Sequence, residues 1–142
     1  MGLDAYVYRN PSSLPFDPAS PGVSIDPETG LIDLEGEMYR FKHEVVALHY
    51  RLGNITAISQ LQSEIRAAAQ NRVPILMEKV VYDGSHCGDY LPLSEMDLIE
   101  RELELLTEVS LANRSQLLGG FIHEMNELVS AARAEKNPIY FG

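Results

Sequence analysis

Both ends of the chain carry a β-strand pattern. In residues 3–8 (LDAYVY) every second residue is apolar, a period of two that predicts a strand with one buried face. Residues 138–141 (PIYF) are apolar and rich in side chains that favour strands. Because an exposed apolar tail would favour non-specific association, we expect this segment to pair as a strand of the sheet. Both ends are therefore expected to lie within one sheet.

Between the ends, apolar residues at spacings of three and four predict helices. Such spacings run through residues 37–52, and Gly53 is expected to end that helix in a left-handed conformation. Asn54 can cap the next helix, so the first two are expected to pack as a short-linked hairpin. The four predicted helices cover about residues 37–52, 54–71, 94–110 and 115–136.

A further strand is expected in the middle of the chain. Residues 73–82 (VPILMEKVVY) are rich in β-branched side chains, which predicts a central strand at 75–82 with Pro74 just at its start. A loop at residues 83–93 follows this strand. Ser94, with Asp97 three residues later, then resembles a short-armed capping box at the start of the third helix.

Residues 9–30 form a proline-rich loop in which no regular element is expected. Proline lacks a backbone donor and restricts the residue before it, so a connection this long is either functional or poorly ordered. Within and after it, residues 26–30 read as a turn, and 31–36 can add a short strand. The prolines are Pro11, Pro15, Pro18, Pro21 and Pro27.

These elements predict a single α+β or α/β domain over residues 1–142. A small sheet of three or four strands is covered by about four helices, in the order strand, helix pair, strand, helix pair, strand. Because two helices separate successive strands, some neighbouring strands are expected to run parallel.

The charge of the chain restricts its partners. The 142 residues carry a formal net charge of −10, which repels phosphate backbones and anionic lipid surfaces. Nucleic acid and membranes are therefore not expected as partners, whereas a basic protein surface is allowed; the same charge can also serve solubility alone. One cysteine and no visible secretory signal favour the cytoplasm.

The loop after the predicted central strand concentrates reactive side chains. Zinc or calcium could use carboxylate, imidazole and thiolate ligands from such a loop, but the spacing fits no established motif. The same residues are also ordinary turn formers. Cysteine catalysis would need a base other than the adjacent histidine, and the remaining histidines lie on predicted helices. No cofactor motif is present. The candidate residues are Asp83, Ser85, His86, Cys87 and Asp89.

The sequence leaves two functions open, and a homodimer is a third possibility. The first is a non-enzymatic binding or accessory protein that meets a basic partner through an acidic helix ridge, Glu100, Glu104 and Glu108. The second is a small metal-binding protein or enzyme centred on the 83–89 loop. A homodimer that pairs through an exposed sheet edge or an apolar helix stripe is the third possibility.

Two short segments resemble groups of small uncharacterised bacterial and phage proteins. The first is the opening Met1-Gly2-Leu3-Asp4, and the second is the strand, turn and acidic helix across residues 80–106. Some proteins of this appearance are described as immunity or phage accessory proteins. The resemblance makes an immunity or accessory role conceivable and assigns no site residue.

Overall fold

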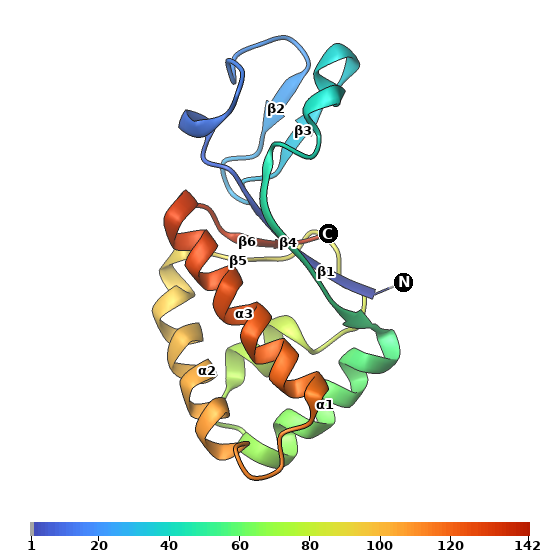
Figure 1. Cartoon of the computed structure of the whole chain (residues 1–142), viewed down its shortest axis with the longest axis vertical. Coiled ribbons are helices and arrows are strands. Elements are labelled where there is room, and N and C mark those ends of the chain that lie inside the picture. The colour runs from blue at the N-terminus through green and yellow to red at the C-terminus, as the bar shows by residue number, and fades with distance from the viewer. Residues whose placement is uncertain (1) are drawn as a thin grey trace.

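The computed structural model describes residues 2–142 as a mixed α+β fold, as the sequence predicts (Figure 1). Its main sheet has four strands in the order β4-β1-β6-β5, and every neighbouring pair is antiparallel. The prediction of parallel neighbours is therefore wrong. The strands are β1 (Gly2–Tyr8), β4 (Val46–Asn54), β5 (Tyr90–Leu91) and β6 (Ile139–Phe141), and the α-helices are α1 (Ile55–Ala69), α2 (Met96–Val109) and α3 (Gln116–Glu135).

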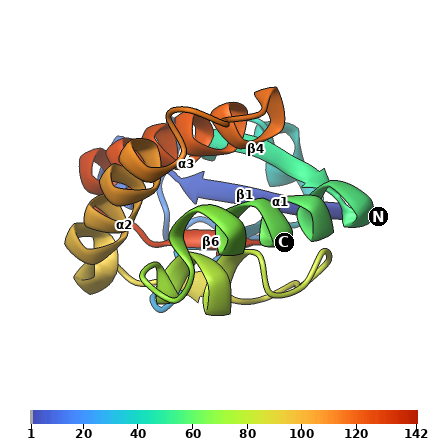
Figure 2. The same ribbon diagram turned by 90° about the horizontal axis from the view of Figure 1, so that it is seen from below.

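The three α-helices cover one face of this sheet, here called the inner face (Figure 2). Leu3, Ala5 and Val7 of β1 point into the core that they form with the helices, and each is 0% exposed. The alternating apolar positions of residues 3–8 thus supply the strand's buried side. Phe121 of α3 and Phe141 of β6 are among the largest fully buried side chains.

Both ends of the chain lie within the sheet, as predicted, and they are neighbours there. β1 and β6 are antiparallel neighbours, with Ala5 opposite Phe141 and Tyr6 opposite Tyr140. Asn137 reinforces this arrangement, because its side-chain amide donates to the carbonyl of Tyr8 at 2.8 Å. The hydrophobic tail is therefore an internal strand of the sheet.

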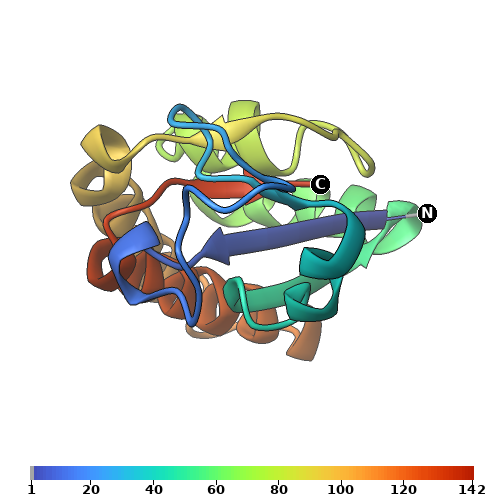
Figure 3. The same cartoon turned by 90° about the horizontal axis from the view of Figure 1, so that it is seen from above.

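A small lobe lies over the opposite, outer face (Figure 3). It is built from the hairpin β2 (Val23–Ile25) and β3 (Ile32–Leu34) and two 3₁₀ helices, η1 (Pro11–Ser13) and η2 (Gly36–Phe41). The expectation that residues 9–30 hold no regular element is wrong, since η1 and β2 lie there. The predicted turn at 26–30 is confirmed: the amide of Gly30 donates to the carbonyl of Asp26 at 2.8 Å.

The predicted helix at residues 37–52 is wrong. Its first part is η2, and its second part is the strand β4, which pairs with β1 along its length. The helical spacing was coincidental, because Val45 packs in the small core beneath the lobe whereas Leu52 packs in the main core. Gly53 belongs to the strand, with an extended φ of 159°. The helix hairpin is consequently absent, although Asn54 does cap α1 by accepting from the amide of Ala57 at 2.8 Å.

The predicted central strand at residues 75–82 is also wrong. Residues Leu76–Val80 form a short π-helical stretch, η3. Buried Val73, Leu76 and Val80 follow a helical spacing, and both carboxylate oxygens of Glu102 from α2 accept amides at its start. A side chain distant in sequence thus caps a helical turn that β-branched composition does not predict.

The third and fourth predicted helices are confirmed as α2 and α3. Ser115 caps α3 by accepting from the amide of Leu118 at 3.0 Å. The capping box at Ser94 is wrong, because a 3₁₀ turn, η4 (Leu93–Glu95), precedes α2 and no side-chain hydrogen bond caps it. None of the helices among residues 2–142 combines the length and apolarity that a membrane span requires.

Candidate functional site

The 83–89 loop docks onto the C-terminal strand. The amide of Gly88 donates to the carbonyl of Phe141 at 2.7 Å, and the amide of Phe141 donates to the carbonyl of Asp89 at 2.9 Å. The loop therefore extends the sheet at β6, the strand that precedes the end of the chain.

His86 is the anchor of this loop. Its side chain is 5% exposed and lies against the rings of Tyr82 and Phe141, with centroid separations of 4.6 and 4.8 Å. Nε2 donates to the carbonyl of Val80 at 2.8 Å. Nδ1 lies 3.1 Å from Asp89 Oδ2, close enough for an ion pair but not aligned as a hydrogen bond. Nε2 is thus engaged by Val80, and no hydrogen bond joins Nδ1 to the thiol of Cys87.

Asp89 lies against His86, but the candidate residues of the loop do not converge on one point. Asp83 accepts the amide of Ser85 at 2.9 Å, which makes a local turn, and Cys87 is exposed. Asp89 accepts from the hydroxyl of Tyr82, and this hydrogen bond is the main cause that raises the pKa of Tyr82 to about 12. Within residues 2–142, no group of three or more His, Cys, Asp or Glu side chains is placed to hold a metal ion.

The acidic ridge is only partly available. Glu100 pairs with Arg133 of α3, which also binds Asp97 at 2.6 Å. Glu104 and Glu108 are exposed on the same side of α2. The structure therefore leaves two of the three predicted carboxylates facing solvent.

A row of aromatic side chains crosses the outer face of the sheet, one from each strand. Tyr90 of β5 is opposite Tyr140 of β6, which is opposite Tyr6 of β1, which is opposite His49 of β4. Directly opposed residues of antiparallel strands share a face. Sequence reasoning missed this row because it placed His49 on a helix and Tyr90 in a loop.

His49 is held at the end of this row. Its ring stacks on Tyr6 with centroids 4.3 Å apart, and Nε2 lies 2.9 Å from Asp4 Oδ1. Arg51, the next outer-face residue of β4, contacts the other oxygen of Asp4 at 3.2 Å. The outer face of β4 thus carries two basic side chains on one carboxylate.

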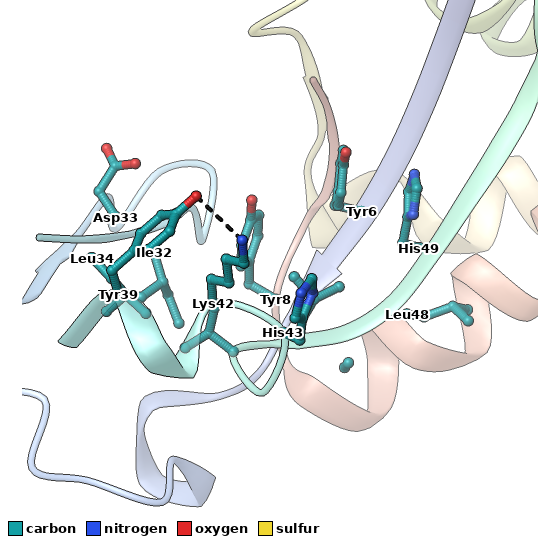
Figure 4. A pocket seen from close by; sticks show the side chains of 13 residues that line it. Tyr6, Tyr8, Ile32, Asp33, Leu34, Tyr39, Lys42, His43, Leu48 and His49 are labelled. Carbon is teal, nitrogen blue, oxygen red and sulfur yellow. Dashed lines mark hydrogen bonds between the residues drawn. The ribbon is translucent and has the colours of Figure 1, made fainter. Parts of the chain in front are cut away.

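Next to this row, a hollow of about 730 Å³ opens between the lobe and the sheet (Figure 4). We call it the outer groove. Its lining comes from β1, β3, η2, the turn at residues 42–45 and the first part of β4. The residues are Tyr6, Tyr8, Ile32, Asp33, Leu34, Tyr39, Lys42, His43, Val45, Val46, Ala47, Leu48 and His49.

One wall of the outer groove is the free edge of the sheet. β4 is the outermost strand and pairs with β1 alone. Leu48 packs against the main core on the inner face, whereas His49 stacks on the outer face, and yet both line the groove. Because these two neighbouring side chains point to opposite faces of the sheet, one hollow can contact both only at the unpaired edge of β4. The hollow therefore runs along that edge.

Hydrogen-bond donors gather at the lobe side of the groove. The ammonium of Lys42 lies 4.7 Å from the centre of the Tyr39 ring and 3.5 Å from its hydroxyl. Tyr8 is 8% exposed, and burial is the main cause that raises its pKa to about 12. The hydroxyl of Tyr8 is therefore a proton donor at neutral pH.

No protein-family model matches the sequence, and no curated protein or solved structure shows significant similarity to it. The resemblance to small bacterial and phage proteins stays a prediction. The outer groove is consequently interpreted from its own residues.

Proposed function

We propose that this chain is a non-enzymatic protein-binding module that accepts an extended polypeptide segment as an additional strand along β4. The observation that carries the proposal is that residues 45–49, with side chains on both faces of the sheet, line a single hollow. Extended segments add to exposed sheet edges through main-chain hydrogen bonds, while adjacent pockets select their side chains. The outer groove supplies both elements.

The lining of the groove supports a polypeptide partner. Tyr39 is a large side chain that is 55% exposed, and Ile32 and Leu34 form the apolar floor beside it. Exposed apolar surface rimmed by polar groups is typical of a protein interaction site. A side chain of the added strand that points to the outer face can pack there.

The edge itself is chemically suited to strand addition. Residues 46–52 (VALHYRL) contain no proline and no acidic residue. Proline and inward-pointing charges are among the features that protect natural sheet edges from pairing. β4 carries two register shifts opposite β1, between Leu3 and Asp4 and between Val7 and Tyr8. We expect the pairing to be centred on the regular stretch between these shifts, residues 48–51, and to continue past the second shift to Val46.

A second surface is proposed for a basic partner, because Glu104 and Glu108 are exposed on α2 in a chain of net charge −10. Reversal of both charges to lysine should slow association with such a partner, and more so at low salt. Reversal of Glu100 should have less effect, because that side chain already pairs with Arg133.

Selection of peptides tests the strand-addition proposal. A display library of random peptides about eight residues long, the length of an ordinary strand, is panned on the whole chain. Selected peptides should bind the Tyr39→Ala variant about tenfold more weakly by calorimetry. The control is Leu111→Ala, which removes another exposed large side chain, 73% exposed and outside the groove. This control should bind as tightly as the original chain.

Two results would overturn the proposal. One is that selected peptides bind both variants equally, which would place their site elsewhere. The other is a dimer, detected by light scattering, that Tyr39→Ala dissociates; a second copy of the chain would then be the occupant of β4. We expect a monomer in the absence of peptide.

A further inference from the structure

The outer groove contains a cation with no anionic partner of its own. Among residues 2–142, no carboxylate lies within ion-pair distance of Lys42 Nζ, which instead rests over the ring of Tyr39. By contrast, Arg51, which lies farther along β4 and outside the lining of the groove, is paired with Asp4. In a chain with almost twice as many acidic as basic residues, Lys42 is available to a ligand.

Two further donors line the same hollow. The hydroxyl of Tyr8 has no hydrogen-bond partner among residues 2–142, and like any tyrosine hydroxyl it is protonated at neutral pH; burial raises its pKa further, to about 12. His43 is exposed and adjacent to Lys42 in the chain. In Figure 4 the side chains of Tyr8, Lys42 and His43 point to the same side of the groove. Their arrangement fits an acceptor with negative charge.

Asp33 is the one acidic residue in the lining of the groove. It contributes to the raised pKa of Tyr8, but less than burial does. In Figure 4 its carboxylate lies beyond Tyr39, away from the ammonium of Lys42. Asp33 therefore leaves the Lys42 side of the groove open to a carboxylate from elsewhere.

We infer that the outer groove selects extended segments that carry an aspartate or glutamate side chain, whose carboxylate binds Lys42 Nζ and the hydroxyl of Tyr8. This inference rests on the proposed strand addition at β4. It specifies the residue of the partner that the groove recognises.

The geometry favours a side chain over a chain-terminal carboxylate. An added strand lies in the plane of the sheet beside β4, and its side chains stand roughly perpendicular to that plane. Tyr8 is opposite Val46 and lies on the outer face, so the side chain of a partner residue that pairs with Val46 stands on the same face of the sheet as Tyr8. A terminal carboxylate would instead continue in the plane of the sheet.

The net charge of −10 does not oppose this local preference. At physiological ionic strength the Debye length is about 8 Å, so distant exposed carboxylates are largely screened from the groove. The groups nearest the bound carboxylate are Lys42, Tyr8 and His43, and the overall charge acts mainly on long-range association.

The selected peptides test the inference directly. They should share an aspartate or glutamate at one position, and its replacement by asparagine or glutamine should weaken binding at least about fivefold. Lys42→Glu should weaken the acidic peptide further and restore binding to a peptide with lysine at that position. Tyr8→Phe, which removes only the hydroxyl, should weaken the acidic peptide severalfold. Leu111→Ala, outside the groove, is the control and should leave binding unchanged.

A second probe makes the two proposals separable. Sodium acetate, titrated against sodium chloride at constant ionic strength, should shift the amide resonances near Lys42 and His43 in the original chain but not in Lys42→Met. Peptides that bind at β4 without an acidic preference would overturn the inference and leave strand addition standing. If no peptide is selected, strand addition fails, and an acetate response that is absent or survives Lys42→Met overturns the inference as well.

Discussion

The imidazole of His49 lies face to face with the phenol ring of Tyr6, with their planes 7° apart. This contact joins the edge strand β4 to β1, the strand at the start of the described chain. It also fixes which residues of β4 face the lobe, because a shift of one position would turn His49 toward the inner face. The groove described above depends on this register.

A double-mutant cycle measures this contact. Tyr6→Leu and His49→Leu should show a coupling of about 0.5 to 1 kcal/mol in urea unfolding, the range of cross-strand aromatic pairs. Tyr6→Leu combined with Leu111→Ala is the control and should be additive, because these sites share no contact. Additive behaviour of Tyr6 and His49 would contradict the stacking.

Glu102 should contribute far more to the stability of the fold than Glu104, which lies two positions later on α2. Its oxygens accept the amides of Ile75 and Leu76 at 3.1 and 2.9 Å, and the residue is 8% exposed. Glu102→Ala leaves buried amides unpaired and should lower the free energy of unfolding by about 1 to 3 kcal/mol.

Glu104→Ala, an exposed position on the same helix, should change the free energy of unfolding by no more than about 0.5 kcal/mol. Equal effects of the two substitutions in denaturant unfolding would show that Glu102 does not cap η3.

The 83–89 loop is expected to hold the last strand, β6, in the sheet. His86→Ala removes the hydrogen bond to Val80 and the contacts with Tyr82 and Phe141, and should cost about 1 to 3 kcal/mol. Cys87→Ala changes the adjacent exposed residue and should have little effect. Amide exchange of residues 139–141 should accelerate in His86→Ala and not in Cys87→Ala. Acceleration in both variants would contradict the role of His86 in holding β6.

Stability at high pH should depend on Tyr8. Its pKa is about 12 in the folded chain and about 10 in the unfolded one. Between these values the unfolded state has lost the proton and the folded state has kept it, so stability falls as pH rises through this window. A difference of about two units corresponds to on the order of 2 to 3 kcal/mol.

Tyr8→Phe isolates this contribution from those of the other tyrosines. In urea unfolding at a series of pH values, the loss of stability between pH 10 and 12 should be smaller in Tyr8→Phe than in the original chain. Parallel pH profiles for the two chains would contradict the burial of the hydroxyl.

The elements that sequence predicts correctly are those with local signals. The alternation in residues 3–8 identifies β1, and one capping residue, Asn54, marks the start of α1. The terminal strand β6 follows from an apolar segment that needs burial. Each of these signals lies within the element that it predicts.

The elements that sequence misses depend on distant partners. The helical spacing across residues 37–52 combines side chains from two separate cores, so β4 was hidden. The turn η3 is capped from α2, and β5 has only two residues. The groove required β4, η2 and the lobe to be placed first. The 83–89 loop could be singled out from composition, and in the structure its backbone pairs with Phe141 of β6.

Amide exchange of residues 46–52 is the most direct test of strand addition. In the free chain, the amides of β4 that point away from β1 should exchange quickly. With a selected peptide bound, they should slow by at least about tenfold, while the amides of α2 stay unchanged. Unaltered exchange along β4 with peptide bound, or protection confined to α2, would contradict the proposal that this edge is the binding site.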